Sequence, residues 1–329
     1  MIKKILPIVI CAMLVAACNK NKTVNETTVF SVVAANFICY DLARAVCGIG
    51  AASMNGTSSV SVNGTGSVSM NRTGMQKTPV NLQLILKPGT DLHSFDPSPK
   101  DIVAIEHAKI FIYTGGESDE WADKLLKTVK NPPLHIFKLM EHIAAEKDEH
   151  EHNHEADEHI WTSPANTLQL IDSLTAALSE CNPVMADIYL TNAAIYKEEI
   201  ENARNAIKNV LAKKEKRVIV MGDRFPLKSF AQEFGIEYYA AFAGCSSAVE
   251  ASPAAVAKLI NIIKEEKLPA VFTMELSNRR IAETIAESTG VKVLELNAAH
   301  NLTRQQFDAG MTYVDTLYAN AESLNAGLR

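Results

Sequence analysis

The chain has 329 residues, enough for two ordinary domains, and 47% of them are hydrophobic, which is typical of proteins with substantial cores. The formal net charge is −6, which argues against a nucleic-acid partner. An acidic balance fits a protein that collects cations, but so small an imbalance does not by itself establish that role.

The first 17 residues have the form of a secretory signal peptide. Two lysines precede an apolar run that is too short to span a bilayer as a mature helix. The sequence Leu14-Val15-Ala16-Ala17-Cys18 looks like a bacterial lipobox, in which Cys18 is acylated and becomes the new N-terminus. We therefore predict a signal peptide over 1–17, a lipid anchor at Cys18, and a polar tether over 18–28 that holds the protein outside the cytoplasm. An ordinary signal peptide cleaved nearby, with Cys18 incidental, is the alternative.

The first part of the mature chain alternates strands with helices. Ser98, Pro99 and Asp101 form a strong helix start, because they supply a cap, a preset first turn and an acid at the positive end of the helix dipole. Residues 50–76 are low in complexity, so we expect a flexible surface insertion there. The expected elements are strands at 29–34, 80–86 and 109–113, and helices at 41–46 and 98–106.

From residue 183 to about residue 214 the chain lacks internal Gly and Pro and repeats apolar residues at helical spacing. About thirty residues make a rod on the order of 45 Å long, which suits a linker between lobes. Strands and helices then alternate again. The second set is expected as strands at 217–221, 238–242, 270–274 and 292–296, and helices at 227–234, 252–266, 277–288 and 304–325. We therefore predict an α/β fold with two parallel-sheet lobes, 29–182 and 217–329, joined by a linker helix over 183–216.

Two histidine motifs indicate a metal site. They are Asp91-Leu92-His93-Ser94-Phe95-Asp96-Pro97-Ser98-Pro99 and Glu158-His159-Ile160-Trp161, and a polar run rich in His and acids, 148–159, leads into the second. Imidazole and carboxylate are the groups that hold a divalent transition metal such as zinc. His93 follows a predicted strand and precedes a helix, where α/β proteins place their binding residues.

These motifs, taken in order, resemble a known family. The lipobox, the two histidine motifs, Tyr113-Thr114-Gly115-Gly116-Glu117-Ser118-Asp119-Glu120-Trp121, the long helix and the C-terminal alternation are similar to the metal-binding substrate-binding proteins of ABC transporters, the helix-linked family that collects zinc or manganese. The resemblance covers nearly all of the mature chain except 50–76. It implies a lipid-anchored monomer that delivers its metal to an ABC permease, with His93 and His159 as interlobe ligands. It also implies weak metal capture by the His-rich run 148–155.

The second lobe departs from the pattern of that family. The usual third ligand, a His or Glu after the first strand of this lobe, is replaced by Asp223, for which a salt bridge to Arg224 is the structural alternative. The usual fourth, an acid after the last strand, corresponds to Asn297, a poor ligand. His300 stands three residues on and is the only histidine of this lobe. We therefore expect His93, His159, His300 and Asp223 as ligands, with Glu275 or water as alternatives at the fourth position.

The ligand types favour zinc. Two or three imidazoles with at most two carboxylates suit Zn²⁺, whereas Mn²⁺, the second choice, prefers more oxygen. A zinc hydrolase outside the cytoplasm would use the same ligands, but the chain has no His-Glu-x-x-His or other hydrolase motif, so we do not expect an enzyme. A binding protein for an organic ligand such as a siderophore needs an aromatic or basic cleft, and aromatic residues make up only 6% of the chain.

Four cysteines remain after processing. A disulfide is permitted outside the cytoplasm, but Cys39 and Cys47, if they lie on one helix, are about 12 Å apart along its axis and too distant to bridge. We expect buried free thiols at Cys39, Cys47, Cys181 and Cys245.

Overall fold

The computed structural model describes residues 30–49, 58–61, 67–70, 74–131, 133–143, 157–242 and 251–329. The predictions for the signal peptide, the Cys18 anchor, the tether, most of 50–76, the His-rich run up to residue 156, and Cys245 lie outside these residues. Within the described part of the chain, none of the helices combines the length and the apolar character needed to cross a membrane.

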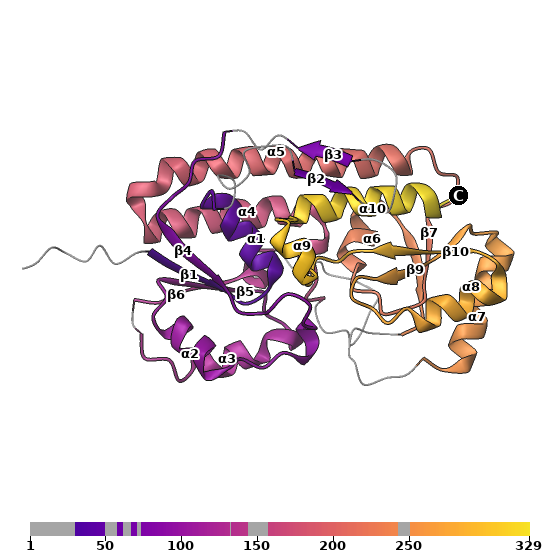
Figure 1. Ribbon diagram of the computed structural model, residues 1–329, viewed down its shortest axis with the longest axis horizontal. Helices are drawn as coiled ribbons and strands as arrows, with labels where there is room; N and C mark the ends of the chain where they lie inside the picture. Colours follow the sequence, from indigo (N-terminus) through magenta and orange to yellow (C-terminus); the bar gives the residue numbers. More distant parts are fainter. Residues whose placement is uncertain are drawn as a thin grey trace, which may run out of the picture.

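The first lobe contains a four-stranded parallel sheet with strand order β4-β1-β5-β6. Helices α1 and α4 contact one face of this sheet, and α2 and α3 lie on the other side (Figure 1). Carboxyl ends of adjacent parallel strands meet at one edge of the sheet, so the loops that follow β1 and β5 lie together. The elements are β1 (Phe30–Ala34), α1 (Phe37–Val46), β4 (Val80–Leu84), α2 (Pro99–Glu106), β5 (Ile110–Tyr113), α3 (Glu120–Leu126), β6 (His135–Lys138) and α4 (Pro164–Cys181).

The second lobe repeats this plan with a parallel sheet in the order β10-β9-β7-β8. The two all-parallel sheets with helices against them confirm the predicted α/β fold of two lobes. The elements are β7 (Val218–Met221), α6 (Lys228–Phe234), β8 (Glu237–Ala240), α7 (Pro253–Glu266), β9 (Ala270–Met274), α8 (Arg280–Thr289), β10 (Lys292–Leu296), α9 (Arg304–Asp308) and α10 (Tyr313–Gly327).

The long helix α5 (Ala186–Leu211) runs along both lobes at the top of Figure 1. Its 26 residues span about 39 Å, somewhat less than the sequence suggests, because a 3-10 turn (Pro183–Met185) precedes it. The helix packs against α1 and α4 of the first lobe and against α10, the C-terminal helix. Its buried side chains recur at helical spacing on one face: Tyr189, Asn192, Ala193, Tyr196, Ile200, Ala203, Ile207 and Leu211.

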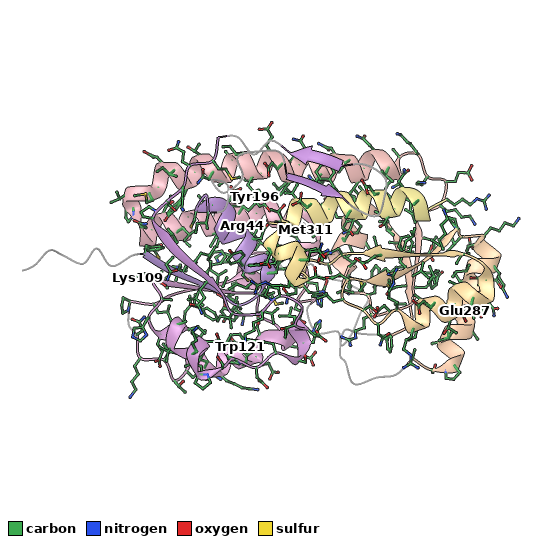
Figure 2. The ribbon with its side chains drawn as sticks, viewed as in Figure 1. Arg44, Lys109, Trp121, Tyr196, Glu287 and Met311 are labelled. Atoms are coloured by element: carbon green, nitrogen blue, oxygen red, sulfur yellow. The ribbon has the colours of Figure 1, made fainter. Side chains whose placement is uncertain are left out.

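Asp41 ties α1, α5 and α10 together in the interior. Its fully buried carboxylate accepts hydrogen bonds from the Tyr196 hydroxyl and from the Tyr313 backbone N–H, the latter at 3.0 Å. Arg44 on α1 is its ion-pair partner and lies near Tyr196 (Figure 2). A buried carboxylate requires such donors, because desolvating it without them is costly. These contacts fix the C-terminal helix, which follows the second sheet, against the first lobe.

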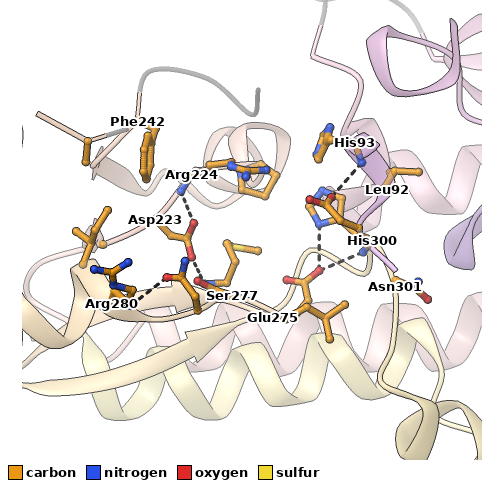
Figure 3. Close-up of a pocket in the computed structure, with 18 of the residues that line it drawn as sticks. Leu92, His93, Asp223, Arg224, Phe242, Glu275, Ser277, Arg280, His300 and Asn301 are labelled. Atoms are coloured by element: carbon orange, nitrogen blue, oxygen red, sulfur yellow. Dashed lines mark hydrogen bonds and ion pairs between the residues drawn. The ribbon is translucent and has the colours of Figure 1, made fainter. Parts of the chain in front are cut away.

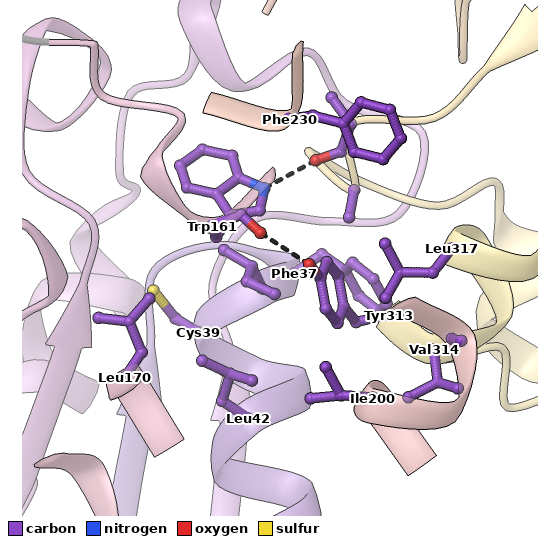
Figure 4. Packing of buried hydrophobic residues seen from close by; sticks show 14 of the residues in the cluster. Phe37, Cys39, Leu42, Trp161, Leu170, Ile200, Phe230, Tyr313, Val314 and Leu317 are labelled. Atoms are coloured by element: carbon purple, nitrogen blue, oxygen red, sulfur yellow. Dashed lines mark hydrogen bonds between the residues drawn. The ribbon is translucent and has the colours of Figure 1, made fainter. Parts of the chain in front are cut away.

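Trp161 and Tyr313 lie in one apolar core that extends across the junction (Figure 4). Both side chains are almost completely buried, and the Tyr313 hydroxyl donates to the Trp161 carbonyl at 2.8 Å. Ile160, the residue after His159, packs against the same core. The motif that carries His159 is therefore anchored by packing and not only by local turns.

Several element boundaries differ from the sequence predictions. Helix α1 begins at Phe37, earlier than expected, because the Asn36 side chain accepts from the Cys39 N–H and caps it. Helix α8 begins only at Arg280, because Leu276 and Arg279 have φ values of 58° and 60°. The expected single C-terminal helix is wrong, because Gly310, at φ 75°, separates α9 from α10.

Strands β2 (Ser58–Ser61) and β3 (Ser67–Met70) pair antiparallel within the expected insertion 50–76. The described cysteines are free: Cys39 and Cys47 are buried, and Cys181 is half-buried. Burial raises the pKa of the Cys47 thiol to about 12, so this thiol stays protonated and unreactive.

Candidate metal centre

Three histidines from distant parts of the chain come together between the lobes. Their candidate ligand atoms all lie within 4.8 Å of one another. His93 lies in a 3-10 turn (Leu92–Ser94) after β4, His159 precedes the 3-10 turn (Ile160–Thr162) before α4, and His300 follows β10. The ring centroids are 5.5 Å apart for His93 and His159, 5.5 Å for His93 and His300, and 4.9 Å for His159 and His300. This geometry could hold a metal ion.

The Nδ1 atom of each imidazole contacts an oxygen. His93 Nδ1 lies 2.7 Å from the Ser118 hydroxyl, and that hydroxyl itself donates to Glu158. His159 Nδ1 lies 2.9 Å from Asp157 Oδ1, and His300 Nδ1 lies 3.1 Å from Glu275 Oε1. A carboxylate, or a hydroxyl that already donates its own proton, can only accept a hydrogen bond from the ring. Nδ1 therefore carries the proton in all three rings, and the lone pair is on Nε2.

Burial keeps the His93 imidazole in the form that binds metal. Desolvation, followed by the nearby His300 and His159, lowers the pKa of His93 to about 3, so the ring is neutral at neutral pH. His300 Nε2 is buried and makes no hydrogen bond to any described residue. A buried polar atom of this kind is costly unless a ligand takes its lone pair.

Asp157 contacts both lobes. Its Oδ1 accepts from His159, and its Oδ2 accepts from the Ser229 hydroxyl on α6 at 3.1 Å. Burial raises the pKa of Asp157, but the hydrogen bonds that the carboxylate accepts from His159 and Ser229 outweigh this effect, so the net shift is downward. The ionised carboxylate orients the His159 ring and increases its basicity toward a cation.

Glu158 and Ser118 are site residues that the sequence analysis did not single out, although both lie within motifs that it quoted. The Ser118 N–H donates to Glu158 Oε2 at 2.9 Å, and the Ser118 hydroxyl donates to Oε1 at 2.6 Å. Gly116 has φ 87°, and a Cβ there would lie 2.5 Å from the Glu158 Cβ. A glycine at this position therefore lets the turn close over the glutamate.

Asp223 lies in the same cleft but is not a member of the three-histidine group. Its Oδ1 accepts from the Arg224 backbone N–H at 2.8 Å, and its Oδ2 accepts from the Thr273 hydroxyl and the Met274 N–H of β9. These bonds join the carboxyl ends of β7 and β9. A role for Asp223 as a metal ligand stays a prediction.

Glu275 supports the loop of His300. It accepts from the His300 N–H and ring and from the Ala298 N–H. The cleft as a whole has a volume of about 670 Å³ and takes its lining from both lobes, including Thr90, His93, Asp223, Asn278 and His300. Figure 3 shows His93 and His300 on the right of this cleft and Asp223 and Arg280 further left.

The chemistry of the donor set fits a divalent transition metal. Imidazole nitrogens bind zinc at about 2.0–2.1 Å, and oxygens on the opposite ring nitrogens are the usual support of such ligands. The protein therefore belongs to a class with two parallel-sheet lobes and a long helix that runs along both. Three histidines at the junction of the lobes form its candidate metal centre.

The chain belongs to the ZnuA family, described as zinc-uptake complex component A, periplasmic, whose pattern matches residues 75–327. The zinc-binding lipoprotein AdcA of Streptococcus pneumoniae is 27% identical over 256 residues, covering 74% of this chain and 50% of AdcA. The high-affinity zinc uptake system protein ZnuA of Bacillus subtilis is 26% identical over 259 residues, covering 75% of this chain and 81% of that protein. The chain thus spans about half the length of the AdcA relatives that it matches.

Solved structures agree with the fold. The Zn(II)-bound ZnuA-like domain of Streptococcus pneumoniae AdcA superposes with a TM-score of 0.70 at 23% identity, covering 90% of this chain and 97% of that one. The metal-dependent lipoprotein YcdH from Bacillus subtilis gives a TM-score of 0.72 at 21% identity, covering 91% and 99%. At these identities the likeness concerns the arrangement of the two lobes.

Proposed function

We propose that this protein captures Zn²⁺ outside the cytoplasm in the cleft between its lobes and delivers it to the permease of an ABC importer. The observation that carries the proposal is the convergence of His93, His159 and His300, each with an oxygen on Nδ1. Three neutral nitrogen donors favour zinc over manganese, which prefers oxygen ligands. The ion is cargo, bound and released without chemical change.

The N-terminal sequence supports a location at the membrane surface. We propose that Cys18 carries the lipid and that residues 18–28 act as the tether, because Leu14-Val15-Ala16-Ala17-Cys18 has the lipobox form. The relative AdcA is named a lipoprotein. A tethered, monomeric binding protein stays near its permease, and the His-rich run 148–155 adds weak capture close to the cleft.

Anaerobic metal competition tests the proposal. Full-length protein in detergent is stripped of metal and mixed with Zn²⁺ equimolar to the protein and with excess Mn²⁺. It is then dialysed and analysed for bound metal. We expect one tightly held zinc ion per chain and no retained manganese. Retention of manganese in place of zinc would contradict the choice of cargo, and retention of neither would contradict metal capture.

A further inference from the structure

Glu158 is a buried carboxylate beside the three-histidine group, although, like Asp223, it is not itself a member of that group. Its Oε1 lies 3.8 Å from His159 Nε2 and 3.5 Å from His93 Nδ1. Two ligands of one tetrahedral zinc ion, each about 2.1 Å from the metal, are about 3.4 Å apart. The separation between Glu158 Oε1 and His159 Nε2 is therefore close to that of two atoms sharing one ion.

Charge gives a second, independent reason. In the described part of the chain, the basic side chains that contact the Glu158 carboxylate are His93 and His159. An imidazole that presents Nε2 to a metal and keeps its proton on Nδ1 is neutral, so neither ring supplies a positive charge. Glu158 is only 8% exposed, and a buried carboxylate without a cation is strongly disfavoured. A bound divalent ion would supply the missing charge.

The carboxylates of the second lobe make their hydrogen bonds within that lobe. Both oxygens of Asp223 accept hydrogen bonds at the ends of β7 and β9. Both oxygens of Glu275 accept hydrogen bonds from the loop of Ala298 and His300. Glu158 Oε1 accepts a hydrogen bond from the Ser118 hydroxyl, has a further lone pair, and lies 3.8 Å from Nε2 of His159 in the three-histidine group.

We infer that Glu158 is the fourth protein ligand of the metal, in place of Asp223. The inference rests on the proposed function and goes beyond it by naming the oxygen donor. Ser118 then holds the carboxylate through its N–H and hydroxyl while it anchors His93, so one residue positions two ligands. The metal would then have three nitrogen donors and one oxygen donor. One of the nitrogens, that of His300, comes from the second lobe.

Cobalt(II) in place of zinc tests this assignment, because its visible absorption reports the coordination shell. Full-length protein in detergent is loaded with Co²⁺, and sodium azide is added as an external anion. We expect no change in the wild-type spectrum, because four protein ligands close the shell. Glu158→Gln keeps one of the two oxygens that accept from Ser118 but opens one position on the metal, so azide should shift its bands and zinc affinity should fall at least about tenfold.

Asp223→Asn is the matched control and should remain insensitive to azide. The inference is overturned if Asp223→Asn responds to azide and Glu158→Gln does not, or if the wild type already responds. Should Glu158→Gln fail to fold by circular dichroism, an azide response of the wild type or of Asp223→Asn still decides against the inference. Absence of any Co²⁺ or Zn²⁺ binding by the wild type would instead contradict the proposed function itself.

Discussion

The indole Nε1 of Trp161 donates a 2.7 Å hydrogen bond to the carbonyl oxygen of Ala298. Trp161 lies two residues after His159, and Ala298 lies two residues before His300. The bond therefore joins the two histidine loops across the lobe junction. Since Trp161 is completely buried, this bond cannot be exchanged for one to water.

Trp161→Phe should weaken zinc binding and lower the free energy of unfolding. The change leaves the Ala298 carbonyl without its donor, and an unpaired buried carbonyl costs about 1–3 kcal/mol. Trp121→Phe is the control, because Trp121 Nε1 is buried with no hydrogen-bond partner in the described part of the chain. Urea unfolding and zinc titration of both variants check this, and equal losses of zinc affinity would count against the role of Trp161.

Zinc should stabilise the metal-free protein. A ligand that binds only the folded state adds RT ln(1 + [L]/Kd), about 4 kcal/mol at a thousandfold excess over Kd. The melting temperature should rise with zinc in the wild type and stay constant in His93→Ala and His159→Ala, which lack an inner ligand. A wild-type melting temperature indifferent to zinc would contradict metal capture.

Deletion of residues 148–155 should separate weak capture from the tight site. The sequence predicts that the histidines of so polar a run lack fixed geometry, so their removal should eliminate the weak zinc equivalents and leave one tight equivalent. Free imidazoles have a pKa of about 6.5, so mild acid should also weaken capture by the run. Isothermal titration of intact and deleted protein at neutral and mildly acid pH measures both effects. Loss of the tight equivalent on deletion would place the principal site in the run.

Asp119 should make the stability of the metal-free protein depend on pH. Burial is the main cause that raises the pKa of this carboxyl from 3.8 to about 7, against hydrogen bonds from the backbone N–H groups of Gly115 and Thr114. Between about pH 4 and 7 the folded state retains a proton that the unfolded state has released, so the free energy of unfolding falls as pH rises. Asp119→Asn removes this contribution. Urea unfolding at pH 5 and pH 8 should show a smaller decrease in the variant, and identical decreases would refute the assignment.

The strand–helix alternation could be predicted because it depends on local patterns. Ser98 starts α2 as predicted, with its N–H bonded to the Asp101 carboxylate at 2.9 Å. The histidine motifs predict a metal site because imidazole is a common ligand of divalent transition metals. By contrast, the start of α8 depends on a left-handed backbone conformation at Leu276. Leucine rarely adopts this conformation, so the sequence does not indicate that the helix begins late.

The supporting residues of the site could not be predicted because their contacts are tertiary. Ser118 meets Glu158 only because Gly116 lets the turn close over it. Asp157 reaches Ser229 of the other lobe, a pairing that no spacing in the sequence indicates. Asp223 follows β7, a position typical of a ligand, and its ligand role stays a prediction. Its Oδ1 accepts from the Arg224 N–H and its Oδ2 accepts from β9, contacts that the sequence does not indicate.

X-ray absorption spectroscopy of the one-to-one zinc complex tests the central claim most directly, because it counts the imidazoles bound to the metal. We predict three imidazoles in the wild type, three in Asp223→Asn and two in His300→Ala, with folding of each variant verified by thermal melting. Two imidazoles in the wild type would contradict a site of three histidines. Three retained in His300→Ala would show that His300 of the second lobe does not bind zinc and would contradict the interlobe site.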